Sequence, residues 1–182
     1  MDRKRFTEIA QDKEDEPVGQ NSNHLQALQD TGFWGNMGAG AIFMAKDTGR
    51  ILLAHRSASV EQPNTWGVWG GAIDKGERPI EAATREAQEE AGITPNPENI
   101  IPLYVFKHQS GFQYFNYLIL VDHEFEPKSG DAHAWETQGH EWATFGKWPS
   151  PLHFGVEGIL RDAKSNKILS ELTQRFGVDN QR

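Results

Sequence analysis

The chain has 182 residues, which is enough for one domain with a substantial hydrophobic core. Its formal net charge of −8 disfavours broad electrostatic binding to a nucleic acid polymer or an anionic membrane. A small anionic substrate remains compatible, because a bound metal ion can reverse the local field. The absence of cysteine excludes disulfides, thiolate zinc sites and cysteine nucleophiles.

The first segment, residues 1–37, is predicted to be a polar N-terminal arm in which residues 24–30 can form a short helix. The main domain is expected over residues 38–177, followed by a tail at 178–182. The basic N-terminus lacks the apolar segment of a secretory signal, and no apolar run approaches transmembrane length. We therefore expect a cytoplasmic protein that is not embedded in a membrane.

The first strands are predicted as a β-hairpin formed by residues 41–45 and 51–54, with a turn over 46–49. A loop over residues 57–65 follows. It leads into the sequence Trp-Gly-Val-Trp-Gly-Gly that starts at Trp66.

A helix is predicted from Pro79, whose fixed φ suits a first helical turn, to Gly92, which can end it in a left-handed cap. Because successive helical residues are about 100° apart, Glu86, Glu89 and Glu90 lie on one face. Carboxylates this close repel one another unless a cation lies among them. Oxygen ligands without histidine or cysteine suit a hard divalent ion such as Mg²⁺ or Mn²⁺. The alternative is an ordinary solvated acidic face.

Strands are predicted next at residues 100–107 and 112–121, the second apolar on both faces like a central strand. A long polar loop over 124–138 precedes a short strand at 141–145. The C-terminal apolar positions have helical spacing up to Gly177, interrupted at Asn166 and Lys167, so one or two helices are expected. This order of elements indicates an α/β or α+β fold.

One stretch resembles the Nudix box of hydrolases that cut a nucleoside diphosphate linked to another moiety. Its matching residues are Gly71, Glu77, Arg85, Glu86, Glu89, Glu90 and Gly92. Softer similarity extends over residues 38–162. The resemblance implies an α/β/α sandwich around a mixed β-sheet.

The resemblance also implies roles for the box residues. Glu86 and Glu90 would be metal ligands, Glu89 a further or water-mediated ligand, and the backbone carbonyl of Gly71 a fourth contact. Glu77 would pair with Arg85, which from its helical position can also reach Glu81 or Glu89. Water would attack phosphorus in line while the metal neutralises charge on the leaving oxygens.

Outside the box, the resemblance makes Glu136 the first candidate for a distant metal ligand or general base, and Glu141 the second. For each, the alternative is a solvated carboxylate. Exchange of Glu136 for Gln is expected to lower the rate on the order of 10²-fold if it is the base. Arg56 follows the second strand, where the family often places a phosphate-binding arginine, and a surface salt bridge is the alternative.

Substrate contacts are less constrained by the sequence. Trp66 is a candidate for substrate binding, and the aromatic run at 112–117 offers a stacking surface, although most such residues belong to a core. Trp69 replaces the proline common before the Gly-Gly pair, and we expect it to alter the pocket wall. The seven histidines lack metal-type spacing and are interpreted as packing or surface groups.

The resulting hypothesis is a Mg²⁺- or Mn²⁺-dependent pyrophosphohydrolase that releases a nucleoside monophosphate and a phosphorylated product. Its substrate would be a small nucleotide such as ADP-ribose, a dinucleoside polyphosphate, a nucleotide cofactor or a nucleoside triphosphate. Two alternatives are a non-hydrolytic nucleotide sensor of the same fold and an RNA 5′-pyrophosphohydrolase, which the net charge disfavours. A homodimer is left open.

Overall fold

The computed structural model describes residues 36–130 and 133–179. The predicted N-terminal arm, with its helix at 24–30, lies outside the described residues apart from its last two positions. Within the described part of the chain, no helix is long and apolar enough to cross a membrane.

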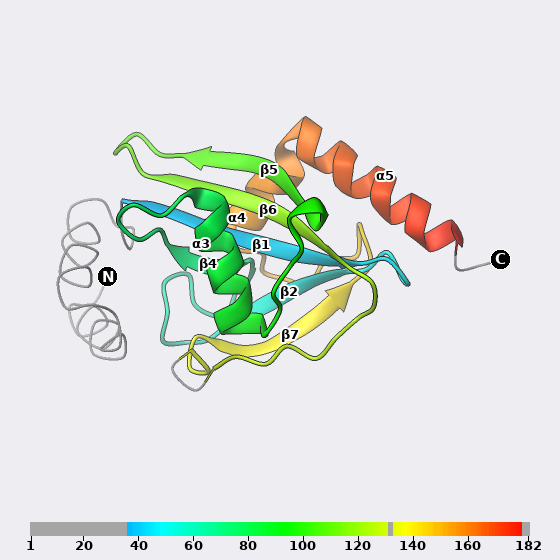
Figure 1. Cartoon of the computed structure of the whole chain (residues 1–182), viewed down its shortest axis with the longest axis horizontal. Helices are drawn as coiled ribbons and strands as arrows, with labels where there is room; N and C mark the ends of the chain where they lie inside the picture. The colour runs from blue at the N-terminus through cyan, green and yellow to red at the C-terminus, as the bar shows by residue number, and fades with distance from the viewer. Residues whose placement is uncertain (1–35, 131–132, 180–182) are drawn as a thin grey trace.

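The centre of the molecule is a seven-stranded mixed sheet, whose strands run across the view in Figure 1. The parallel pair β1–β6 occupies its middle, and the other pairs are antiparallel. The predicted hairpin and the two strands after the box are confirmed. The strands are β1 (Met37–Ala45), β2 (Ile51–Arg56), β3 (Trp66–Gly67), β4 (Trp69–Ala72), β5 (Ile100–Lys107), β6 (Gln113–Val121) and β7 (Thr137–Ala143).

Strand β1 changes partner along one edge. Its residues 38–41 pair with β4, whereas Phe43 and Met44 pair with β2. The chain passes from β3, on the β2 side, to β4 through the single residue Val68. The sheet therefore divides next to the glycines that lead into the acidic helix.

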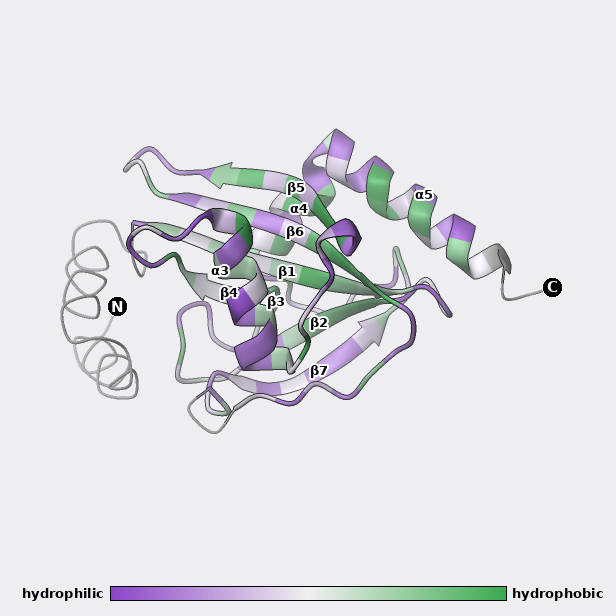
Figure 2. Ribbon diagram, viewed as in Figure 1, coloured by the Kyte–Doolittle hydropathy of each residue, from purple (hydrophilic) through white to green (hydrophobic). Residues whose placement is uncertain are grey.

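Helices cover both faces of the sheet (Figure 1). Helix α3 (Pro79–Glu86) packs its alanines on one face, in a core that includes Phe43, Leu52 and Trp69. Helices α4 (Phe154–Arg161) and α5 (Ala163–Asp179) cover the other face. Figure 2 shows apolar residues along much of β1 and β2, whereas β7 and much of α3 are polar. The predicted α/β/α sandwich around a mixed sheet is confirmed.

The strand predicted at 141–145 was misplaced, because β7 starts at Thr137 and ends at Ala143. Polar residues that sequence alone assigns to a loop become a strand because they pair with the edge of β2, where His140 lies opposite Ala54. Tertiary pairing here overrides a weak local preference.

The C-terminal segment does form two helices, but the break is at Asp162 and not at the predicted Asn166–Lys167. Asp162 has an extended ψ of 116°, and its carboxylate accepts a hydrogen bond from the backbone N–H of Ser165 at 2.9 Å. Asn166 stabilises the junction by donating to the carbonyl of Leu160 at 3.0 Å. The second helix continues past the predicted end at Gly177, to Asp179.

The expected role of Trp69 in a pocket wall is wrong. Its side chain is 1% exposed and lies in the core beneath α3. Of the aromatic run predicted as a stacking surface, Phe112 and Tyr117 are also buried. The core alternative holds for these three residues.

Candidate active site

The acidic helix begins at Pro79 and closes at Gly92, as predicted. Gly92 has φ +75°, a left-handed conformation that glycine adopts without steric cost. The last turn, η1 (Ala87–Ala91), is π-helical, which the 3.6-residue period cannot anticipate. Such turns occur often at functional sites, and this one carries Glu89 and Glu90.

Two of the three predicted carboxylates are buried against the sheet. Glu86 is 6% exposed and Glu90 is 5% exposed. A Cβ at Gly71 on β4 would stand only 2.5 Å from Oε1 of Glu86, so the glycine provides the space that this carboxylate occupies. The Gly71 carbonyl oxygen lies on the β1 side, 3.2 Å from where a Cβ of Gly38 would be.

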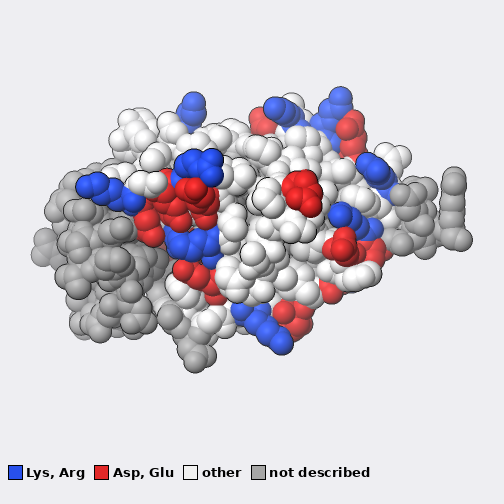
Figure 3. All heavy atoms as spheres, viewed as in Figure 1, with Lys and Arg blue, Asp and Glu red and all other residues white. Residues whose placement is uncertain are grey.

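Arg85 organises the carboxylates around it. Its guanidinium lies 2.9 Å from Glu77, 3.0 Å from Glu86 and 3.1 Å from Glu89. Burial alone would lower the pKa of Arg85, but the hydrogen bond with Glu77 and the charge of Glu86 outweigh it and raise that pKa. Figure 3 shows acidic and basic side chains gathered over α3.

Two further contacts of Arg85 complete this network. Its guanidinium also donates to the carbonyl of Ala72 at 3.0 Å and lies 3.7 Å from Asp74. The pairing with Glu81 that the sequence allows does not form. Glu81 pairs with Arg78 at 3.0 Å and also accepts the Arg78 backbone N–H at 2.8 Å, which caps the helix instead.

The loop between β6 and β7 is fastened to the end of the acidic helix. Lys128 N–H donates to the carbonyl of Ala91 at 3.2 Å, and Gly130 N–H donates to that of Glu89 at 2.9 Å. These backbone hydrogen bonds hold the loop next to the turn that carries Glu89 and Glu90. They explain how residues more than 40 positions downstream reach the helix without any sequence motif at that distance.

His133 links Glu136 to the acidic cluster, which consists of the carboxylates of Glu86, Glu89 and Glu90. The two ring nitrogens of His133 contact one carboxylate each: Nδ1 lies 3.3 Å from Glu136 Oε1, and Nε2 lies 3.7 Å from Glu89 Oε2. The hydrogen bond with Glu136 raises the pKa of His133 against the opposing effect of burial. Sequence reasoning assigned all histidines to packing or the surface and missed His133, because its contacts depend on the fold of the loop.

Glu141 is not brought to this cluster. It is exposed on β7 opposite Leu53, whose side chain packs on the α4–α5 side of the sheet. Its neighbour Trp142 pairs with Leu52 on the α3 side. Because strand side chains alternate between faces, Glu141 points away from α3.

The two predicted substrate-binding residues already have partners. Arg56 donates to the carbonyl of Glu61 at 2.9 and 2.6 Å and lies 3.7 Å from the carboxylate of that residue. This is the ion pair that the sequence offered as the alternative to phosphate binding. One face of Trp66 stacks on His55, with ring centroids 4.2 Å apart and planes 7° from parallel.

Glu86, Glu89 and Glu90 offer carboxylate oxygens, which suit a hard divalent cation. The space at Gly71 holds the Glu86 carboxylate against the sheet. In the part of the chain that the structure describes, no three histidine, aspartate or glutamate side chains already converge as a ligand set. Arg85 draws Glu86 and Glu89 toward itself, so a metal would have to compete with this guanidinium for the carboxylates.

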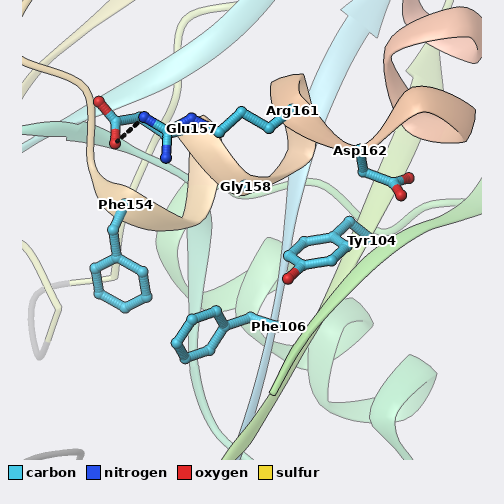
Figure 4. A pocket seen from close by; sticks show the side chains of 7 residues that line it. All are labelled: Tyr104, Phe106, Phe154, Glu157, Gly158, Arg161 and Asp162. Carbon is cyan, nitrogen blue, oxygen red and sulfur yellow. Dashed lines mark ion pairs between the residues drawn. The ribbon is translucent and has the colours of Figure 1, made fainter. Parts of the chain in front are cut away.

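A separate pocket of about 370 Å³ lies on the opposite face of the sheet, between β5 and α4 (Figure 4). Aromatic rings of Tyr104, Phe106 and Phe154 form its walls, with the rings of Phe106 and Phe154 5.1 Å apart. Glu157, Arg161 and Asp162 stand at its polar side. The predicted aromatic surface at 112–117 thus missed these rings, which come from two distant segments.

The β5 strand at this pocket contains a bulge, and two side chains form hydrogen bonds with the backbone there. The register between β5 and β6 shifts between Pro102 and Val105. At the bulge, Tyr104 N–H donates to the Ser165 hydroxyl and Tyr104 C=O accepts from the Asn116 amide, each at 2.9 Å. Bulges redirect side chains, and this one is fixed from both sides.

An α/β/α sandwich with a glycine-bounded acidic helix on one face defines the Nudix class of fold. The sequence matches the model of the NUDIX domain over residues 36–162, and the chain belongs to that family. The family resemblance inferred from the box is therefore confirmed.

Three similar proteins illustrate the relationship. A nucleoside triphosphate pyrophosphatase/Nudix hydrolase fusion protein of Bifidobacterium longum is 34% identical over 57% of this chain and 23% of its own length. The 8-oxo-dGTP diphosphatase of Escherichia coli is 28% identical over 58% of this chain and 68% of its own length. The crystal structure of a Nudix hydrolase from M. smegmatis, RenU, superposes with a TM-score of 0.57 at 25% identity, covering 78% of this chain and 88% of that one.

Proposed function

We propose that this chain is a divalent-metal-dependent pyrophosphohydrolase acting on a small nucleotide, with nucleoside triphosphates as the first substrate class to test. The observation that carries the proposal is the pair of buried carboxylates, Glu86 and Glu90, of which Glu86 lies beside Gly71 and Arg85. Burying two like charges is unfavourable unless a positive charge is supplied. The name of one relative supports the substrate class, since the Escherichia coli relative is an 8-oxo-dGTP diphosphatase.

In the proposed mechanism, Glu86 and Glu90 would hold Mg²⁺ or Mn²⁺, with Glu89 as a further ligand. A divalent ion bound there would neutralise charge on the phosphate oxygens. Arg85 keeps Glu86 and Glu89 oriented, and an ion pair with Glu77 fixes the position of Arg85. The oxygen of water forms a bond to phosphorus as the bridging P–O bond breaks, and the bridging oxygen leaves with the departing phosphate.

Glu136 is proposed as the group that accepts a proton from the attacking water. Its side chain is only 16% exposed and reaches the cluster through His133, which contacts Glu89. A carboxylate in this position can take the proton while His133 fixes its orientation. Glu141, the second candidate, is disfavoured because it lies on the opposite face.

The aromatic pocket between β5 and α4 is proposed to receive the base of the nucleotide. Three rings supply stacking surfaces, and Glu157, Arg161 and Asp162 supply hydrogen-bonding groups at one side. The pocket volume of about 370 Å³ falls within the usual range for small-molecule sites. Trp66 and Arg56 are proposed to contribute at the β2–β3 side of the site, Arg56 after exchanging Glu61 for a phosphate.

The test is product analysis by mass spectrometry after incubation with pooled nucleotides and Mg²⁺ or Mn²⁺. The pool contains canonical and oxidised nucleoside triphosphates, ADP-ribose, dinucleoside polyphosphates, nucleotide cofactors and nucleotide sugars, and the control is Glu90→Gln. We expect a nucleoside monophosphate and pyrophosphate from a triphosphate with wild type alone. Tight binding without cleavage by wild type would replace the enzyme with a nucleotide sensor.

A further inference from the structure

The side chain of Tyr114 on β6 packs over glycines of two other strands, β1 and β4. A Cβ at Gly38 would stand 2.5 Å from Cδ2 of the Tyr114 ring, and one at Gly40 would stand 2.5 Å from its hydroxyl. A Cβ at Gly70 on β4 would stand 2.4 Å from the same hydroxyl and also meet the backbone of β1. The ring therefore extends from β6 across β1 to β4, over positions that have no side chains.

The register of the sheet places this tyrosine between the two parts of the site. Tyr114 is the partner of Phe106 in β5 and of Gly38 in β1, and paired residues share one face of a sheet. Phe106 lines the aromatic pocket. At the other end, the hydroxyl reaches Gly70, and the next residue, Gly71, contacts Glu86.

The hydroxyl is a neutral donor close to the carboxylates. Burial raises the pKa of Tyr114, and the charges of Glu90 and Glu86 raise it further, so the phenol keeps its proton at neutral pH. A protonated phenol in this position can donate a hydrogen bond to a bound ligand.

We propose that Tyr114 is a substrate-binding residue whose hydroxyl donates a hydrogen bond to the sugar–phosphate portion of the nucleotide. This portion joins the base in the aromatic pocket to the anhydride at Glu86 and Glu90, and the Tyr114 hydroxyl lies along that connection. The inference rests on the proposed function, because it assigns a contact to the same substrate. A hydrogen bond there selects a nucleotide over a bare polyphosphate.

The test compares wild type, Tyr114→Phe and a matched control, Tyr117→Phe. Tyr117 lies on the same strand but faces the core beneath α3, so its exchange removes a hydroxyl on the other face. Calorimetry in Mg²⁺ measures binding of a deoxynucleoside triphosphate analogue with a non-hydrolysable α–β link, and of inorganic triphosphate. We expect Tyr114→Phe to weaken the analogue about 3–10-fold and to leave inorganic triphosphate unchanged. The melting temperature should be retained, and Tyr117→Phe should bind both ligands as wild type does.

Equal affinity of wild type and Tyr114→Phe for the analogue would overturn the assignment, as would an equal loss for both ligands. Absence of any analogue binding by wild type would overturn it as well. Failure of the proposed function has a different signature, since a wild type that binds the analogue but cleaves no nucleotide still reports the Tyr114 contact.

Discussion

The two faces of the sheet differ in the kind of interaction that fills them. Beneath α3, charged groups are held close together, with Arg85 contacting Glu77, Glu86 and Glu89 within 3.1 Å. Beside α4, aromatic rings surround an open pocket of about 370 Å³. The partner change of β1 lies next to glycines of β1 and β4, over which the side chains of Tyr114 and Glu86 pack.

Under the proposed function, this difference assigns a separate task to each face. Phosphate chemistry requires concentrated charge and bound metal, and a nucleotide base requires flat apolar walls with few polar groups. The charged groups could not lie among the aromatic rings without a loss of stability, because burying a charge in apolar surroundings costs free energy. The sheet lies between the two environments and keeps them apart.

The largest effect should come from the charged face. Glu90→Gln is expected to lower kcat for nucleotide cleavage about 10³-fold, since it removes a carboxylate ligand and several kcal/mol of charge stabilisation. In metal-free solution the variant should melt at or above the wild-type temperature, because a buried like charge has been removed. Steady-state kinetics and thermal melts measure the two effects. A wild-type kcat would show that Glu90 does not hold the metal.

The loop contribution should be next in size. Glu136→Gln is expected to reduce kcat on the order of 10²-fold, because an amide cannot accept the proton of the attacking water. Glu141→Gln is the matched control on the opposite face and should stay within about twofold of wild type. Comparable rates for the two variants would remove Glu136 from the role of base.

The sequence predicts the charged face better than the aromatic one, for a physical reason. The box is local: Gly71, the helix and Gly92 are close in the chain, so spacing alone positions Glu86 and Glu90. The pocket joins β5 to α4, segments about 50 residues apart, and its bulge depends on Ser165 and Asn116. His133 depends in the same way on backbone bonds between a loop and η1. No periodicity encodes such contacts.

A smaller effect is expected on the aromatic face. Ser165→Ala removes a buried hydroxyl and leaves the partly buried N–H of Tyr104 without its acceptor, so it should lower the free energy of unfolding by about 1–2 kcal/mol. Ser170→Ala, which removes a hydroxyl from the exposed side of the same helix, should change it by less than about 0.5 kcal/mol. Urea unfolding of the two variants measures the difference, and equal stability would contradict the role of Ser165 in fixing the bulge.

The smallest effect concerns pH. Burial lowers the pKa of His153 to about 3, with help from the charge of Arg56. Because the folded pKa lies below the unfolded value of about 6.5, the unfolded state takes up the proton first as pH falls. Stability should therefore decrease below about pH 6.5, by at most about 1.4 kcal/mol per pH unit from this group.

His153→Asn should reduce that slope while keeping a side-chain acceptor for the Gly155 N–H, which His153 Nδ1 now accepts at 3.0 Å. Melting temperatures recorded between pH 5 and 8 for the two proteins provide the comparison. Parallel curves would mean that His153 titrates normally in the folded chain.

The most direct measurement of the central claim follows the oxygen of water into the product. Wild type and Glu90→Gln are incubated with a deoxynucleoside triphosphate in ¹⁸O-water, with Mg²⁺ or with a chelator, and the products are weighed by mass spectrometry. The account predicts one ¹⁸O in the monophosphate or the pyrophosphate, formed by wild type only when Mg²⁺ is present. Labelled product at the same rate with the chelator, or from Glu90→Gln, would contradict it.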